Sequence, residues 1–163
     1  MSVIKADRKE SRLEAVVYAE KVHDILTKLG QENYGIRDVR RALRPKYVPR
    51  RNEDPDIDYY LALLRNARTE IDTKAYLLSD DVRSAYSIYP TDMEEYNRRR
   101  EYQDFAIAKC AQIQKDLGHI AEIFNVNLNM FEEGVKAVDR EKELIKKWRQ
   151  RDNRFKRKLR GSL

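Results

Sequence analysis

Three segments of this chain, each about 30 residues long, carry apolar residues at the period of an α-helix. A helix of that length spans roughly 45 Å, and its apolar stripe stays exposed unless a neighbouring helix covers it. The pattern therefore favours a bundle of packed helices. In the segment predicted to be helical over 57–88, the stripe is close to a heptad repeat and consists of Ile57, Leu61, Leu64, Ile71, Ala75, Leu78, Val82 and Ala85.

The remaining helices are predicted from the same pattern. Over 92–124 the stripe consists of Tyr96, Gln103, Ala106, Ile107, Cys110, Ile113, Leu117, Ile120 and Phe124. Over 129–159 it consists of Phe131, Val135, Val138, Ile145, Trp148, Phe155 and Leu159. A shorter helix is predicted over 10–29, with Gly30 as its stop signal and with apolar positions at Ala15, Tyr18, Ala19, Val22, Ile25, Leu26 and Leu29.

Capping residues and breakers divide these helices. Asp56 or Asp58 can cap the second predicted helix, and Thr91 or Asp92 can cap the third. The connection over 31–56 is irregular, although a short helix over 36–43 fits its apolar residues, and it contains Gly35, Pro45, Pro49 and Pro55.

The predicted fold class is all-α, and the predicted architecture is an up-down-up-down antiparallel four-helix bundle. Short links between long helices favour antiparallel neighbours. We expect a single domain over 1–163, in which a longer, basic, proline-containing connection over 31–56 follows the first helix. We find no run of 18 apolar residues and no signal-peptide pattern after Met1, so we expect a soluble cytoplasmic protein that does not enter a membrane.

Signals for catalysis are weak. The chain has no glycine-rich phosphate loop and no GxSxG motif. Glu20 and His23 form an ExxH pair like those of di-iron bundles, but a complete site needs a second pair and two further carboxylates. The one cysteine, Cys110, lies on an apolar stripe and is most simply a small buried hydrophobe. We therefore expect no enzymatic activity and no cofactor, with a metal-binding bundle enzyme as an alternative.

The last part of the chain is strongly basic. Between 140 and 160 there are eleven Lys or Arg residues and three acids, so the net charge is 11 − 3 = +8, above the +6 of the whole chain. A helix that buries one side and presents a basic side is suited to a polyanion. A solvated face that aids solubility, or a helix lying on an acidic membrane, is the alternative interpretation.

Two further basic groups precede this segment. Arg98, Arg99 and Arg100 are adjacent, so at least one must lie near the buried side of its helix or meet a partner. Between 37 and 51, seven bases and one acid give a charge of +6, whereas 52–97 has eleven acids and four bases and a charge of −7. The seven bases form a possible additional nucleic-acid surface, made up of Arg37, Arg40, Arg41, Arg44, Lys46, Arg50 and Arg51.

Three stretches carry a family resemblance: SVIKADRKESRLEA (Ser2 to Ala15), EEYNRRREYQDFAIAKC (Glu94 to Cys110) and LIKKWRQRDNRFK (Leu144 to Lys156). In their order and spacing they resemble the accessory variability determinant proteins. These are the small basic partners of the reverse transcriptase in diversity-generating retroelements of phages and bacteria. The connection over 31–56 departs from the family, because it is longer and richer in proline.

The resemblance implies a four-helix bundle that assembles into a homopentamer, a barrel-like ring with a basic surface, in the cytoplasm of a bacterial host. It implies binding to the reverse transcriptase of the same element, to template RNA and to cDNA, in support of mutagenic cDNA synthesis and retrohoming. The protein itself would carry no catalysis. Together with the charge pattern, it gives a predicted binding role to Arg98, Arg99, Arg100, Lys146, Lys147, Arg149, Arg151, Arg154, Lys156 and Arg157.

Two other non-enzymatic interpretations stay open. One is a four-helix bundle of the kind encoded within ribosomal RNA intervening sequences. The other is a phage interaction protein that uses its basic faces for assembly. A reverse-transcriptase gene beside an imperfect repeat pair would favour the retroelement.

Overall fold

The computed structural model describes residues 13–32, 36, 38–49 and 54–161, and over these residues its regular structure is helical apart from an isolated β-bridge. The long helices are α2 (Glu14–Gln31), α4 (Ile57–Ser87), α5 (Met93–Ile123) and α6 (Leu128–Arg151). Shorter elements are α3 (Val39–Ala42), the 3-10 helix η2 (Pro45–Tyr47) and α7 (Asn153–Gly161). The prediction of an all-α chain with four long helices is therefore confirmed.

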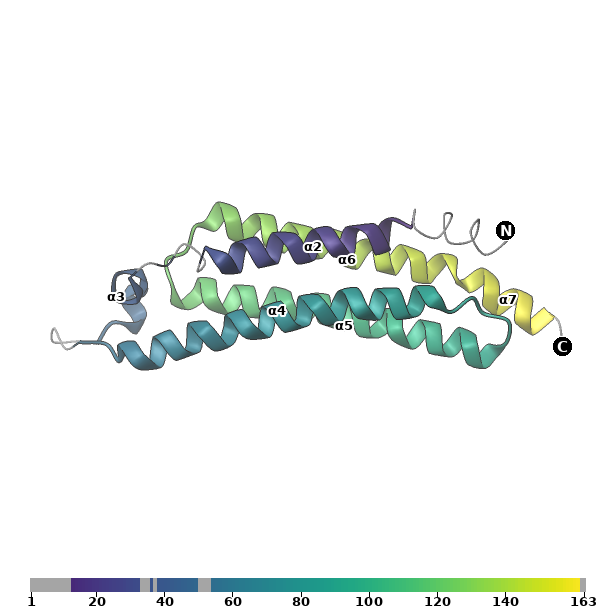
Figure 1. The fold of residues 1–163 in the computed structure, drawn as a ribbon, viewed down its shortest axis with the longest axis horizontal. Coiled ribbons are helices and arrows are strands. Elements are labelled where there is room, and N and C mark those ends of the chain that lie inside the picture. Colours follow the sequence, from purple (N-terminus) through teal and green to yellow (C-terminus); the bar gives the residue numbers. More distant parts are fainter. Residues whose placement is uncertain (1–12, 33–35, 37, 50–53, 162–163) are drawn as a thin grey trace.

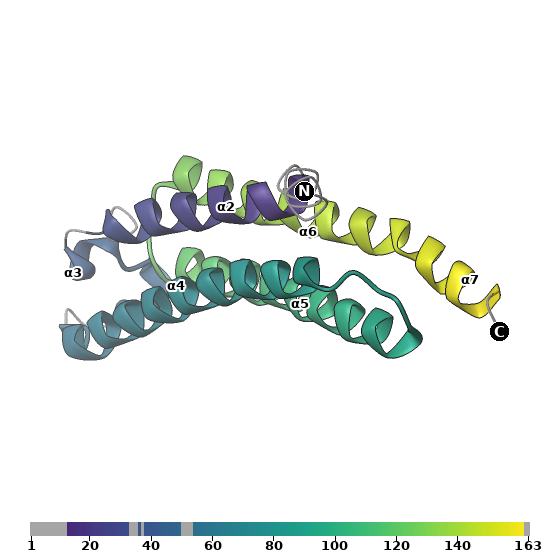
Figure 2. The same ribbon diagram turned by 45° about the vertical axis from the view of Figure 1, so that its right-hand side comes forward.

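The long helices pack against one another around one core. α2 contacts α4 and α6, and α5 contacts the same two helices. Figure 1 shows α3 and α7 at opposite ends of this elongated arrangement, and Figure 2 shows α2 lying along α6. Among the described helices, none has the length and apolarity needed to cross a lipid bilayer. All four long helices contribute fully buried side chains, including Leu26, Leu78, Ile113 and Ile145.

Polar side chains cap three of the long helices, because the first backbone N–H groups of a helix lack partners within it. Of the candidates predicted for each helix, the structure uses Asp56 for α4 and Asp92 for α5. Asp56 accepts a hydrogen bond from the N–H of Tyr59 at 3.1 Å, and Asp92 accepts one from the N–H of Glu95 at 2.7 Å. Asn127 caps α6.

The basic connection is tied to the turn between α5 and α6. Leu43 forms the β-bridge with Phe124. Arg44 donates from its backbone N–H to the carbonyl of Ile123 at 2.9 Å, and from Nε to the carbonyl of Ala121 at 2.8 Å. α3 is a single turn over Val39–Ala42 and occupies only the later part of the short helix predicted over 36–43.

The last helix differs from the prediction of one unbroken helix over 129–159. α6 ends at Arg151 and α7 begins at Asn153, with Asp152 between them. The N–H of Phe155 donates to the carbonyl of Asp152, three residues earlier, at 2.9 Å. The helix is therefore tightened into a 3-10 turn at this junction, and the side chain of Asp152 is buried there.

Glu141 is an acid buried in the core on α6. Its side chain is inaccessible to solvent, and neither carboxyl oxygen has a hydrogen-bond partner among the described residues. Burial disfavours the charged form and raises the pKa of Glu141 from 4.5 to about 8. The folded protein therefore keeps this carboxyl group mostly protonated at neutral pH.

Replacing Glu141 with Gln should flatten the pH dependence of folding stability. As pH rises from about 4.5 to about 8, the unfolded chain loses this proton while the folded chain keeps it. The free energy of unfolding of the wild-type protein should therefore decrease over that interval, by at most about 5 kcal/mol. Urea denaturation followed by circular dichroism at several pH values measures this decrease. Exposed Glu143→Gln is the control, and an unaltered pH profile in Glu141→Gln would contradict the prediction.

Candidate nucleic-acid interface

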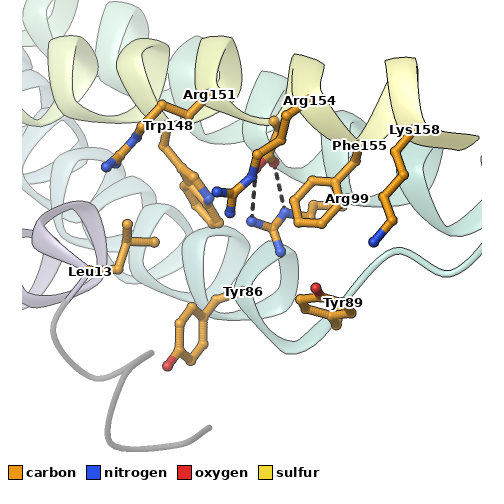
Figure 3. A pocket seen from close by; sticks show the side chains of 10 residues that line it. Leu13, Tyr86, Tyr89, Arg99, Trp148, Arg151, Arg154, Phe155 and Lys158 are labelled. Carbon is orange, nitrogen blue, oxygen red and sulfur yellow. Dashed lines mark hydrogen bonds and ion pairs between the residues drawn. The ribbon is translucent and has the colours of Figure 1, made fainter.

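A buried ion pair joins the start of α5 to the junction between α6 and α7. Arg99 donates from Nε to Asp152 Oδ2 at 2.8 Å and from Nη2 to Asp152 Oδ1 at 3.0 Å (Figure 3). Its Nη1 donates to the carbonyl of Ile88 at 2.8 Å. Gln103 Nε2 also donates to Asp152 Oδ2, at 2.8 Å. Such a two-point pair fixes orientation as well as distance, so it positions the C-terminal helices against α5.

The same guanidinium lies close to two aromatic rings. Arg99 Cζ is 5.0 Å from the centroid of the Trp148 ring and 5.5 Å from that of Phe155, within the range of cation–π attraction. Only 7% of Arg99 is exposed. The hydrogen bonds of Arg99 are made inside the protein, because a buried cation requires an internal partner, so this geometry gives no support to its predicted binding role.

The neighbours of Arg99 have different surroundings. Arg98 is exposed, whereas Arg100 is half-buried. Arg100 Nη1 donates to the hydroxyl of Tyr96 at 2.9 Å and to Asn153 Oδ1, at the start of α7, at 3.4 Å. The three arginines thus extend from the surface to the core, as their adjacency predicts, and Arg100 brings the α5 group into contact with the C-terminal group.

The basic residues of α6 and α7 flank a buried seam on both sides. Along the seam, buried residues alternate at spacings of four and three: Glu141, Ile145, Trp148, Asp152 and Phe155. One flank, which we name the first basic row, carries Lys147, Arg151, Arg154 and Lys158. The other flank, the second basic row, carries Lys142, Lys146, Arg149, Lys156 and Arg160.

The two rows differ in how their charges are neutralised. In the second basic row, Arg149 Nε is 3.0 Å from Asp104 Oδ1 on α5, and Lys146 Nζ is 3.6 Å from Glu143 Oε1. Arg157 is exposed on the outer side of α7. Within the described part of the chain, no ion pair is formed by three members of the first basic row, which are Lys147, Arg151 and Arg154. Among the described residues, Lys142, Lys156 and Arg160 of the second basic row also form no ion pair, so the rows differ in this respect only at Lys146 and Arg149. The first basic row is the better candidate for binding an external anion because Arg151, Arg154 and Lys158 also line a cavity.

A cavity of about 710 Å³ lies beside the first basic row. Tyr86 and Tyr89, from the end of α4 and the connection that follows it, line one side, and Arg154 and Phe155 of α7 line another (Figure 3). Arg99 lies between these sides. The ring of Tyr89 packs edge to face against Phe155, with centroids 5.4 Å apart and planes at 83°.

The basic residues of the connection are not brought to this region, because α3 and α7 lie at opposite ends of the molecule (Figure 1). Their charges are engaged locally by acids or by a backbone carbonyl. The described members are Arg40, Arg41, Arg44 and Lys46, whereas Arg37, Arg50 and Arg51 lie outside the described residues.

The surroundings of the ExxH pair on α2, Glu20 and His23, do not supply the further ligands that a metal site needs among the described residues. Glu20 contacts the guanidinium of Arg83 on α4. Across the described ranges, no group of three or more His, Cys, Asp or Glu side chains is placed to hold a metal ion. Cys110 is fully buried, and burial raises the pKa of its thiol to about 12, which disfavours the reactive thiolate.

Sequence reasoning missed two residues of this region, Asp152 and Tyr89. Asp152 occupies an apolar register position between Trp148 and Phe155. An acid at such a position, inside a basic run, indicates an internal cationic partner. Tyr89 gave no such signal, because it lies outside any helix and has no periodic pattern to place it.

Comparison with family models, with curated proteins and with solved structures gives no match for this chain. The resemblance to accessory variability determinant proteins therefore stays a prediction from sequence. The geometry adds one relation between its motifs: the stretch with Arg98 to Arg100 packs against the stretch with Lys146 to Arg151. Most of the third motif, Ser2 to Ala15, lies outside the described residues.

Asp152→Ala should destabilise the fold by about 3–5 kcal/mol, because it leaves the buried Arg99 cation without its partner. The matched control is Asp104→Ala, which breaks a partly exposed ion pair and should cost less than about 1 kcal/mol. Urea denaturation followed by circular dichroism measures both values. If the two variants lose similar amounts of unfolding free energy, the buried Arg99–Asp152 pair stabilises the fold no more than the partly exposed pair does.

Proposed function

We propose that this chain is a non-enzymatic accessory protein of a diversity-generating retroelement. It binds the reverse transcriptase and the template RNA of that element and supports mutagenic cDNA synthesis and retrohoming. We further propose that the four helices form an up-down-up-down antiparallel bundle, that five copies form a ring, and that the ring acts in the bacterial cytoplasm. The sequence resemblance supports the identity of the partners.

The observation that carries the RNA-binding part is the first basic row, which is held on a rigid seam. Its first and last positions, Lys147 and Lys158, are eleven residues apart, or roughly 16 Å along a helix, so the cations form a line. An RNA strand presents a line of phosphates, and cations that neutralise them release counterions. Lys147, Arg151 and Arg154 form no ion pair with an acid among the described residues. A phosphate can therefore bind these three side chains without breaking an existing ion pair.

Ring assembly would multiply this attraction. Five copies with a formal charge of +6 each carry 5 × 6 = +30. A surface of that charge captures a polyanion at long range and makes the affinity steeply dependent on salt. The phosphate contacts would position the RNA without reading its sequence, because the contacting groups are lysines and arginines directed at the backbone.

Charge reversal of the first basic row should weaken RNA binding. Lys147→Glu with Arg154→Glu should lower the affinity for a labelled single-stranded RNA at least about tenfold, and should reduce the salt slope by about 1.4. The control is Arg40→Glu with Arg41→Glu, an equal charge change at the opposite end, for which we expect less than about a twofold loss. Fluorescence anisotropy at several salt concentrations measures both quantities. Equal losses in the two double variants would refute a localised interface.

Contact with the reverse transcriptase is tested separately. The protein should co-purify with the reverse transcriptase encoded beside its gene, and Arg98→Glu should weaken that complex at least about fivefold, as expected for an arginine at an interface. The control is Lys115→Glu, which makes the same change of charge at another exposed position of α5. Circular dichroism verifies that both variants are folded. Retention of the full complex by Arg98→Glu would exclude this residue from the contact.

A further inference from the structure

The cavity beside the first basic row combines two kinds of side chain that a phosphate-binding surface alone does not need. Its volume of about 710 Å³ lies within the range of about 300–1,000 Å³ typical of small-ligand sites. The cations Arg151 and Arg154 line it together with the aromatic residues Tyr86, Tyr89 and Phe155. A ligand that uses both classes carries negative charge and a flat ring with an aromatic face.

Tyr89 is the side chain that most needs an explanation. It is 62% exposed, it lines the cavity, and its ring forms a T-shaped pair with Phe155. A T-shaped contact leaves ring surface uncovered, and an exposed aromatic surface is costly in water. A second planar ring stacked on Tyr89 would cover that surface.

At the base of the cavity, the charge of Arg99 already has an acid partner inside the protein. All three donor groups of Arg99 that face neighbours are engaged, two by Asp152 and one by the Ile88 carbonyl. The anionic part of a ligand is therefore directed to the rim, where Arg151 and Arg154 form no ion pair with described residues.

We propose that this cavity takes one unstacked base of a single-stranded nucleic acid, stacked on Tyr89, with the adjoining phosphates at Arg151 and Arg154. The inference rests on the proposed RNA binding and adds to it a site for a base and a preference for single strands. A duplex keeps its bases stacked on one another, so it has no free base to offer. Stacking on an aromatic side chain tolerates any base, because every base has a π-face.

The test compares two labelled strands that differ only in their bases. One is a single-stranded RNA of mixed sequence, and the other is the same strand with abasic sites, which keeps every phosphate. Wild-type protein should bind the intact strand about five- to a hundredfold more tightly, the range expected for stacking of one base. Tyr89→Ala should remove this advantage and leave the affinity for the abasic strand unchanged. Tyr89→Trp should retain it.

Tyr76→Ala is the matched control for Tyr89→Ala. Tyr76 is 63% exposed and lies on α4 outside the cavity lining, so its removal should change neither affinity. The single tryptophan, Trp148, lines the cavity and supplies a second readout. The intact strand should change the emission of Trp148 at saturation, and the abasic strand should change it less. The same sequence as DNA shows whether the sugar matters: an equal advantage assigns the site to the base, and an advantage confined to RNA assigns part of it to the 2′-hydroxyl.

The failure of this proposal can be told apart from the failure of RNA binding itself. If neither strand binds at low salt, the proposed function fails. If both strands bind with equal affinity and Tyr89→Ala behaves like the wild-type protein, RNA binding stands and the base site is refuted. Binding of polyglutamate that depends on Tyr89 would also overturn the proposal, because it would assign the cavity to an acidic peptide.

Discussion

The buried pair between Arg99 and Asp152 is the contact on which the proposed interface depends. Neither ion could remain in the interior alone, because desolvation of an isolated charge is costly. The two-point geometry, the bond from Gln103 and the nearby rings of Trp148 and Phe155 offset that cost. The pair also fixes where α7 lies relative to α5. This one contact therefore determines where the first basic row and the cavity beside it lie.

The same seam contains a second acid, Glu141, which avoids carrying a charge because its pKa is raised. Asp152 is paired with a guanidinium, whereas Glu141 has no partner among the described residues and has a raised pKa instead. The two acids are eleven residues apart, or about three helical turns, on one side of the same helix pair. One acid is therefore kept as a charge by its partner, and the other is kept neutral by its surroundings. Both solutions avoid an unpaired charge in the core.

The helices were predictable from sequence because apolar periodicity reports directly which side of a helix is buried. Most positions of the predicted stripes of α4 and α5 are therefore buried, although Ile57, Leu61 and Ile107 are only half-buried. The caps Asp56 and Asp92 are each one of the two candidates predicted for their helix. The proposed interface was visible in the sequence only as a set of basic residues, because periodicity does not reveal side-chain pairing between helices. The internal pairing of Arg99 could not be predicted for that reason, since its partner Asp152 lies 53 positions away. Tyr89 was missed because a connection has no period.

A helix as short as α7 depends on its surroundings for its order. An isolated helix is marginal below about 12–15 residues, and α7 spans Asn153–Gly161 with Phe155 as its buried residue. Its five bases, unrelieved by any acid within it, repel one another along the helix. An anion that neutralises them removes this repulsion and therefore favours the helical state. Under the proposed function, binding of an RNA strand would therefore also stabilise α7 against local unfolding.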